Sequence, residues 1–142
     1  MFAKQLTVFI ENRTGRLCEV LNVLKTNKVN ILSLSLADTT EFGLLRLIVD
    51  NPEAGKEKLT EGGYSSLLSD VSVIKIPHTA GSLQELLRVI DEAGVNIEYM
   101  YGLSIEAEDA HVVLKASDAA KIDEILTKNG VTTLSTEQLA DL

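Results

Sequence analysis

The chain has few of the residues from which disulfide frameworks and metal sites are built. Its 142 residues include one cysteine (Cys18), two histidines, two prolines and no tryptophan. A single cysteine excludes an intramolecular disulfide and a multi-cysteine metal site. Neither histidine, His78 or His111, has a cysteine or a suitably spaced acidic partner. We therefore expect neither a metal ion nor any other cofactor.

Positive charge is also scarce. The chain has 13 lysines and arginines and 21 acidic residues, which gives a net charge of -8. Binding to phosphates needs clustered basic residues, so a nucleic-acid partner is not expected. No apolar run approaches the roughly 18 residues of a membrane span. The start, Met1–Leu6, lacks the basic and apolar segments of a signal peptide. We expect a soluble, cytoplasmic protein with no membrane partner.

The main positive feature is an internal repeat. Val8–Tyr64 aligns with Ile74–Gly130 at an offset of 66 positions without a gap. Within Gly15–Ile31, eight of the seventeen residues are identical to the residue 66 positions later. A unit of this size is a small domain. We predict two domains, residues 1–70 and 71–142, which pack side by side and are joined between Ser69 and Asp70.

Each half shows the order β-α-β-β-α-β, judged from apolar periodicity and turn residues. The order predicts an α+β fold of two ferredoxin-like units, each a four-stranded antiparallel sheet with helices on one face. In the first half we expect strands at Leu6–Ile10, Asn30–Leu36, Gly43–Val49 and Ser66–Leu68, a polar turn at Asp38–Glu41, and helices from Leu17 and over Pro52–Glu61. In the second half we expect strands at Val71–Ile76, Asn96–Leu103, Ala110–Lys115 and Val131–Leu134, helices at Ser82–Ala93 and Asp118–Lys128, and a last helical turn in Ser135–Leu142.

The turn between the first strand and the first helix of each half is the most informative local motif. It spans Asn12–Leu17 and His78–Leu83. A helix N-terminus offers unpaired N–H groups and partial positive charge to a carboxylate, and glycine lets the backbone approach a ligand. Asn12 or Thr14 is expected to cap the first helix.

A second motif, Val-Asn-Ile, follows the same helix in both halves at Val29–Ile31 and Val95–Ile97. Asparagine both donates and accepts hydrogen bonds, as a zwitterionic amino acid requires. The alternative is that the glycines only form turns and that Asn30 and Asn96 only terminate helices.

Other side chains have simpler interpretations. Cys18 is expected to pack at the edge of a helix core. Glu19 and Glu85 fall on a solvated helix face. Tyr99 and Tyr101 either line a side-chain pocket, which favours an aromatic or bulky ligand, or pack within their strand.

The two motifs together resemble the ACT domain. The pattern is an apolar strand, [Asn/Asp]-x-x-Gly-x-Leu, an amphipathic helix and Val-Asn-Ile, and the chain is similar to stand-alone tandem ACT-domain proteins from about Leu6 to Leu134. In place of the common Arg-Pro-Gly it has Arg13–Thr14–Gly15 and Thr79–Ala80–Gly81, and His78 replaces the usual Asp or Asn, so the first turn is the closer match.

The resemblance implies amino-acid binding that regulates a metabolic enzyme, at a place where the turn of one domain faces the second strand of its partner. The turn Asn12–Leu17 would face Asn96–Tyr101, and His78–Leu83 would face Asn30–Leu34. The ligand-binding residues that the resemblance implies are Asn12, Arg13, Thr14, Gly15, Arg16, Leu17, Asn30, Ile31, Leu32, Ser33, His78, Thr79, Ala80, Gly81, Ser82, Leu83, Asn96, Ile97, Glu98 and Tyr99.

These observations favour a non-catalytic regulatory module that binds a free amino acid, forms a homodimer and acts with a metabolic enzyme. One alternative is a ligand-free dimerisation or assembly module for an enzyme partner. The other is an acylphosphatase-like enzyme that uses Arg13, Arg16 and Asn30. The sequence does not name the amino acid, the enzyme or the pathway.

Overall fold

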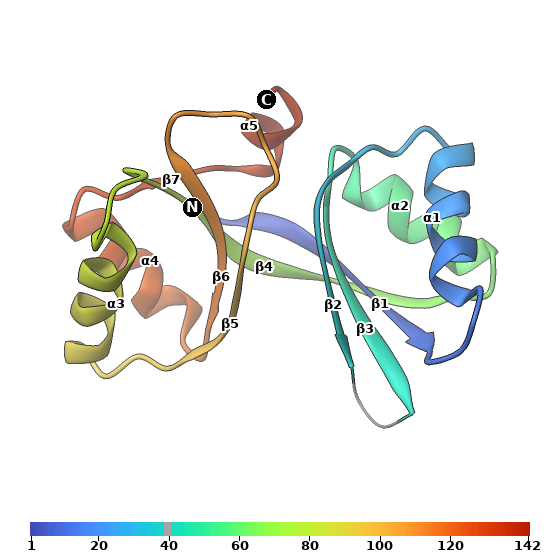
Figure 1. Cartoon of the computed structure of the whole chain (residues 1–142), viewed down its shortest axis with the longest axis horizontal. Coiled ribbons are helices and arrows are strands. Elements are labelled where there is room, and N and C mark those ends of the chain that lie inside the picture. The colour runs from blue at the N-terminus through green and yellow to red at the C-terminus, as the bar shows by residue number, and fades with distance from the viewer. Residues whose placement is uncertain (39–40) are drawn as a thin grey trace. The chain divides into compact units, whose positions relative to one another are not determined.

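The computed structural model describes residues 1–38 and 41–142, which form two compact units (Figure 1). The N-terminal unit comprises Lys4–Ser69 with Leu139–Asp141, and the C-terminal unit comprises Asp70–Gln138 with Met1–Ala3 and Leu142. Each unit is a ferredoxin-like fold, which confirms the predicted fold class.

In the N-terminal unit the strands are arranged in the order β2–β3–β1–β4. Both β2 and β1 pair with β3 in antiparallel register. Helices α1 and α2 lie on one face of this sheet (Figure 1). The elements are β1 (Ala3–Glu11), α1 (Arg16–Thr26), β2 (Ile31–Asp38), β3 (Phe42–Val49), α2 (Pro52–Glu61) and the first part of β4 (Ser65–Ile76).

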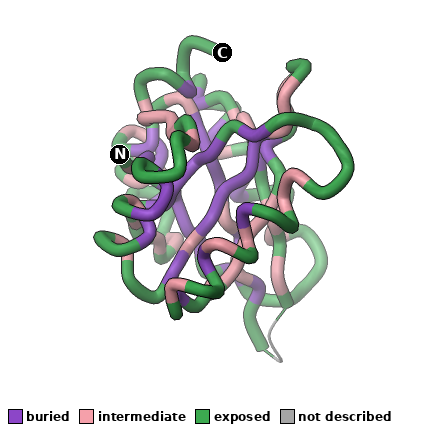
Figure 2. The backbone as a smooth tube through the Cα atoms, turned by 90° about the vertical axis from the view of Figure 1, so that its left-hand side faces the viewer, coloured by how far each residue is buried: buried purple, intermediate pink, exposed green. Residues whose placement is uncertain are grey.

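The core of this unit follows from the alternation of side chains along the strands. Leu6, Val8 and Ile10 of β1 are buried and point toward the helices, because successive strand residues face opposite sides. Leu24 of α1 and Leu59 of α2 are fully buried against them. The buried segments, purple in Figure 2, accordingly concentrate on the strands, while turns and outer helix faces are exposed.

The C-terminal unit repeats this arrangement, with strand order β5–β6–β4 and β7 paired to β4. Its core includes Leu86 and Ile90 of α3 and Ile122 and Leu126 of α4. The elements are the second part of β4, α3 (Ser82–Glu92), β5 (Ile97–Gly102), β6 (Ala110–Ala116), α4 (Ala119–Lys128), β7 (Thr132–Thr133) and, in the tail, α5 (Thr136–Ala140).

Most predicted element boundaries are correct within a residue or two. The two units divide between Ser69 and Asp70. Both residues lie inside β4, a continuous twelve-residue strand, because polar residues are compatible with a strand that has one exposed face. The prediction that Asp38 belongs to a polar turn is wrong, since it belongs to β2. The middle of that expected turn, Thr39 and Thr40, lies outside the described residues.

Helices α1 and α3 end in the same hydrogen-bonded motif. The N–H of Val29 donates to the carbonyl of Leu24, and the N–H of Val95 donates to that of Ile90, as in a Schellman motif. The residue that turns the chain after the helix adopts left-handed backbone angles. It is Gly94 (φ 74°) after α3 and Lys28 (φ 58°) after α1.

This motif explains part of the repeated Val-Asn-Ile. Val29 and Val95 are buried as the apolar residues that follow the helix end. Asn30 and Asn96 come after the turn is complete, so the interpretation that they terminate the helices is wrong. Each is exposed and directly precedes a strand. The carbonyl of Asn30 accepts the N–H of Asp50, just after β3 (3.1 Å), and the carbonyl of Asn96 accepts the N–H of Ser117, just after β6 (2.9 Å).

Lys28→Gly is expected to raise the free energy of unfolding by about 0.5–1 kcal/mol. The left-handed conformation costs an L-residue roughly 1–2 kcal/mol, and glycine removes this cost. The greater conformational entropy of glycine in the unfolded chain offsets about half of the stabilisation. Urea unfolding measures the change. The control Lys25→Gly, inside α1, should lower stability by about 1 kcal/mol, and equal losses for both variants would contradict a left-handed residue 28.

Candidate functional site

The strand-to-helix turns have the same backbone geometry in the two units. Gly15 (φ 90°, ψ -17°) precedes α1, and Gly81 (φ 88°, ψ -10°) precedes α3. A Cβ at either position would have no atom of residues 1–38 or 41–142 within 4 Å beyond the adjoining backbone. Glycine is therefore needed for its left-handed conformation and not because its surroundings are crowded.

Neither helix has a side-chain cap at this end, so the prediction that Asn12 or Thr14 caps α1 is wrong. A capping residue needs extended backbone angles, whereas the residue before the helix is a left-handed glycine. Asn12 instead donates its Nδ2–H to Oδ1 of Asp38, at 3.1 Å. Among the described residues no side chain caps the helix start, which therefore keeps its partial positive charge.

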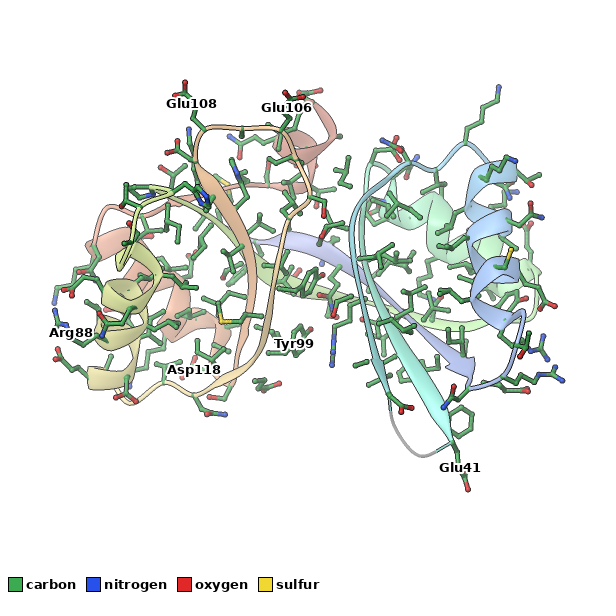
Figure 3. All side chains as sticks on the ribbon, viewed as in Figure 1. Glu41, Arg88, Tyr99, Glu106, Glu108 and Asp118 are labelled. Carbon is green, nitrogen blue, oxygen red and sulfur yellow. The ribbon has the colours of Figure 1, made fainter. Side chains whose placement is uncertain are left out.

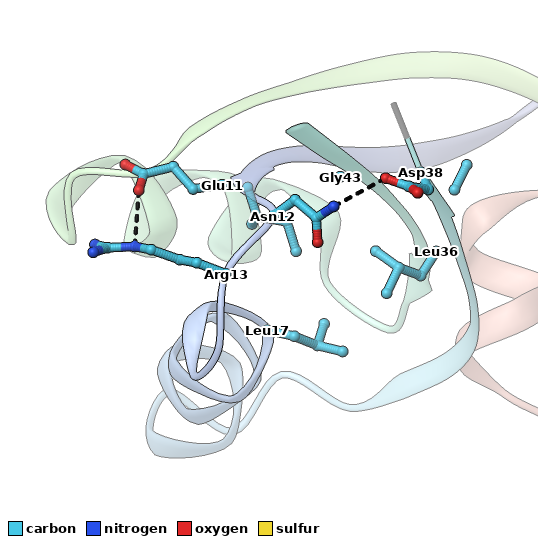
Figure 4. Close-up of a pocket in the computed structure, with 9 residues that line it drawn as sticks. Glu11, Asn12, Arg13, Leu17, Leu36, Asp38 and Gly43 are labelled. Atoms are coloured by element: carbon cyan, nitrogen blue, oxygen red, sulfur yellow. Dashed lines mark hydrogen bonds and ion pairs between the residues drawn. The ribbon is translucent and has the colours of Figure 1, made fainter. Parts of the chain in front are cut away.

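A pocket of about 210 Å³ opens beside the first turn, at the end of β1 where β2 and β3 meet (Figure 4). One side is apolar and the rim carries two carboxylates, an amide and a guanidinium. Figure 4 shows the amide of Asn12 between Asp38 and Leu17. The lining residues are Ile10, Glu11, Asn12, Arg13, Leu17, Leu36, Ala37, Asp38 and Gly43.

A network of charged and hydroxyl groups surrounds the first turn, and two of its members, Glu11 and Arg13, also line the pocket. Glu19 accepts hydrogen bonds from the hydroxyl of Tyr64 (2.9 Å) and from Nη1 of Arg16 (3.0 Å). Glu11 pairs with Nε of Arg13 at 2.8 Å and with Nη2 of Arg16 at 3.5 Å. Ion pairs therefore connect the end of β1 to the start of α1, and a hydrogen bond connects α1 to Tyr64, the residue before β4.

The network shifts the ionisation of its members. The hydrogen bond from Tyr64, followed by that from Arg16, lowers the pKa of Glu19 below its ordinary value. The same carboxylate raises the pKa of Tyr64, because the phenol donates to a negative charge. It also raises the pKa of Arg16 through their hydrogen bond.

The second turn lacks this network, since Ser82 and Gly130 stand where the first half has Arg16 and Tyr64. There the hydroxyls of Thr79 and Ser82 lie 2.6 Å apart. Glu85, the counterpart of Glu19, pairs with Arg88 of the same helix, which lowers the pKa of Glu85. Arg88 itself points outward from α3 (Figure 3).

Two adjoining grooves of about 660 and 370 Å³ flank α3 and share Leu87 and Asp91. The structure gathers predicted residues along them. Thr79, Gly81 and Leu83 line the first groove, with Gln84 and Arg88. Asn96 and Ile97 line the second, with Ile90, Val95 and Met100.

The remaining predicted residues of the C-terminal unit lie apart from these grooves. Ser82 borders a pocket of about 350 Å³ on the other side of α3, beside Glu85. His78 and Ala80 are exposed in the turn. On β5, Glu98 is exposed and Tyr99 is half-buried.

In the N-terminal unit the pocket brings together Asn12, Arg13 and Leu17, but not the predicted residues of β2. Asn30 and the start of β2 lie at the other end of α1, about 16 Å along a helix of eleven residues. The expected meeting of each turn with a strand of the other repeat stays a prediction. The predicted residues at this end of the helix are Asn30, which precedes β2, and Ile31, Leu32 and Ser33 of β2.

This separation counts against an acylphosphatase-like site. Arg13 and Arg16 are both paired with carboxylates, and Asn30 is a helix length away from them. An anionic phosphate would have to compete with Glu11 and Glu19 for the two guanidinium groups.

Sequence reasoning missed the pocket residues Leu36, Asp38 and Gly43, because strand pairing brings them to the turn from positions distant in the chain. The prediction that Cys18 packs at the edge of a helix core is wrong, because the residue is exposed. Glu19 was expected to be only solvated; it is exposed, but Tyr64 and Arg16 bind it.

Among the described residues no group of three or more His, Cys, Asp or Glu side chains could hold a metal ion. In the same part of the chain, every helix is too short or too polar to cross a membrane.

Comparison with known proteins identifies relatives over the full length. A family model described as "ACT domain pair" matches residues 1–142. Protein BT0572 from Bacteroides thetaiotaomicron is 36% identical, with a TM-score of 0.93 over 100% of this chain and 98% of that one. The search of curated proteins found no match.

Two more distant structures share the fold alone. The ligand-free regulatory subunit of aspartate kinase from Thermus thermophilus is 16% identical, with a TM-score of 0.60 over 88% of this chain and 91% of that chain. The regulatory subunit of aspartate kinase from Thermus flavus is 14% identical, with a TM-score of 0.57 over 90% of each chain.

Tyr64→Phe is expected to move the pKa of Glu19 upward, toward its ordinary value, because the variant lacks the largest cause of the depression. An NMR pH titration of the Glu19 carboxyl carbon measures this shift.

A carboxyl group whose pKa is depressed in the folded state stabilises the fold at pH values above the ordinary pKa of glutamate. This stabilisation is lost as the pH falls through the depressed pKa. Tyr101→Phe, the same change in the other unit, should leave Glu19 unchanged, and an equal shift there would refute the assignment.

Proposed function

Since the chain belongs to the ACT domain pair family, we propose that it is a non-catalytic regulatory module that binds a free amino acid. One observation carries the proposal. Both units present an uncapped helix N-terminus behind a left-handed glycine, Gly15 or Gly81, although the side chains around the two turns differ. Because a left-handed glycine stands before each helix, the backbone N–H groups at both helix starts are left available to a ligand carboxylate.

The chemistry of the turns suits an α-amino acid. Its carboxylate matches the partial positive charge and the backbone amides at the helix start. Its ammonium group matches oxygen acceptors such as Asp38 and Asn12 at the first turn. We propose the two turns, Asn12–Leu17 and His78–Leu83, as the primary binding segments, with Asn30–Ser33 and Asn96–Tyr99 as further contacts.

We further propose that binding controls a metabolic enzyme and that the chain acts as a homodimer in the cytoplasm. The regulatory subunits of aspartate kinase, which share this fold, support the kind of role but not a particular enzyme. A domain of this size buries a modest core, which makes association with a second copy favourable.

A ligand-free assembly module is the second candidate function. Leu34 and Leu36 lie on β2, the outermost strand of the N-terminal unit, and are 46% and 50% exposed. Exposed apolar residues on a sheet edge favour pairing with another chain.

Amino-acid binding predicts a rise in melting temperature. At a concentration of about 100 times Kd, an amino acid that binds only the folded state stabilises it by about 2.7 kcal/mol, which amounts to several degrees for a protein of this length. Differential scanning fluorimetry with each of the twenty amino acids measures the shift. A combined Asn30→Leu and Asn96→Leu variant should lose the shift without unfolding, because both residues are exposed.

Asn22→Leu, the same change on the exposed surface of α1, is the matched control and should keep the full shift. If none of the twenty amino acids raises the melting temperature, the sensor proposal is wrong and the assembly role replaces it.

A further inference from the structure

We propose that the C-terminal unit carries a second binding site, for a small phenolic molecule, in the pocket of about 350 Å³ beside Ser82 and Glu85. The N-terminal unit fills the corresponding place with a phenol ring of its own, that of Tyr64. The C-terminal unit keeps the apolar wall and the carboxylate of this place but replaces the ring by a smaller side chain. The proposal does not depend on amino-acid binding at the two turns.

The Tyr64 ring shows which chemical group this place accommodates. Tyr64 is half-buried and packs against the core of the N-terminal unit. From the residue before β4 it reaches the first turn of α1, where its hydroxyl donates to Oε2 of Glu19 at 2.9 Å. Packing of the ring combined with a hydrogen bond from the hydroxyl is the arrangement that a buried phenol favours.

In the C-terminal unit a valine has the backbone position of this tyrosine. Gly63 and Gly130 are both left-handed, with φ 85° and 67°. The next residue, Tyr64 or Val131, donates its N–H to the same carbonyl position of the preceding helix. The counterpart by backbone geometry is therefore Val131, one residue beyond Gly130, on which the 66-residue offset falls. Neither residue can supply a ring.

The shorter side chain leaves a pocket with an apolar wall and a polar rim. Ile76 and Leu86 are each 7% exposed, and Val89 and Val131 are half-buried. A ring placed against these four side chains would remove apolar surface of both partners from water. The rim is formed by Pro77, Ser82, Glu85 and Asn129.

Glu85 supplies an acceptor for the phenol hydroxyl. It is the counterpart of Glu19 on the equivalent helix and lines the pocket. Arg88 donates to both of its oxygens, but a carboxylate has about four acceptor sites and can accept a further hydrogen bond. Ser82 replaces Arg16, whose guanidinium binds the carboxylate of Glu19 in the N-terminal unit. The approach to Glu85 from the pocket is thereby left to a shorter side chain.

An NMR titration of the backbone amides of the full chain with p-cresol tests the proposal. This probe has the ring and hydroxyl of a tyrosine side chain but neither the ammonium nor the carboxylate that the turns would bind. Saturable shifts should centre on Glu85, Leu86 and Val89. Toluene, which lacks the hydroxyl, should bind about tenfold more weakly, because a hydrogen bond to a charged acceptor is lost.

Two variants separate a specific site from an apolar surface. Glu85→Gln should weaken p-cresol binding about three- to tenfold, because the acceptor loses its charge. Glu92→Gln removes the other carboxylate that pairs with Arg88, at a residue outside the pocket lining. This matched control should change the affinity less than about twofold, since an exposed ion pair contributes little. Val131→Tyr should abolish binding without lowering the melting temperature, because the chain then supplies the ring itself.

Four results would overturn the phenol site. They are the absence of saturable shifts, shifts centred on residues outside the pocket, equal affinity for toluene, and equal effects of Glu85→Gln and Glu92→Gln. Undiminished p-cresol binding in a folded Val131→Tyr variant would place the probe elsewhere and would contradict the comparison with Tyr64. None of these results bears on amino-acid binding at the turns, so failure of this proposal is distinguishable from failure of the proposed function.

Discussion

A left-handed glycine at the junction of the first strand and first helix is the constraint on which each unit depends. Gly15 and Gly81 reverse the chain within a few residues, so that the helix starts directly above the end of its strand. Only glycine adopts this conformation at little cost. Because the chain enters the helix through glycine, no side chain caps the first turn. The polarity of the helix start is therefore available beside the strand ends.

The rest of each unit preserves this geometry by packing. Leu24 and Leu59 anchor the two helices of the N-terminal unit on the sheet, and Ile90 and Ile125 stand at the equivalent positions of the C-terminal unit. The Schellman motif at the far end of each first helix fixes its length as well. Both ends of the helix are thus defined by local backbone geometry, while its orientation is defined by buried side chains.

The duplicated backbone carries two different chemical environments. The first turn is held by Arg16, Glu19 and Tyr64, whereas the second has Ser82 and Gly130 in place of the arginine and the tyrosine. The pocket beside the first turn likewise depends on side chains that the second repeat does not keep. Duplication preserved what the fold requires of the backbone, and the surface around each turn diverged because few of its residues contribute to the core.

The sequence by itself determined the repeat, the order of elements, most helix boundaries and the two special glycines, because apolar periodicity and glycine conformation are local properties. It could not show that β4 is continuous, that Cys18 is exposed or that Glu19 binds Tyr64, 45 residues away. Asp38 and Gly43 joined the site only through the pairing of β2 and β1 with β3. Strand register and side-chain contacts between distant segments depend on how the whole unit packs, so only the tertiary structure decided which side chains surround the turn.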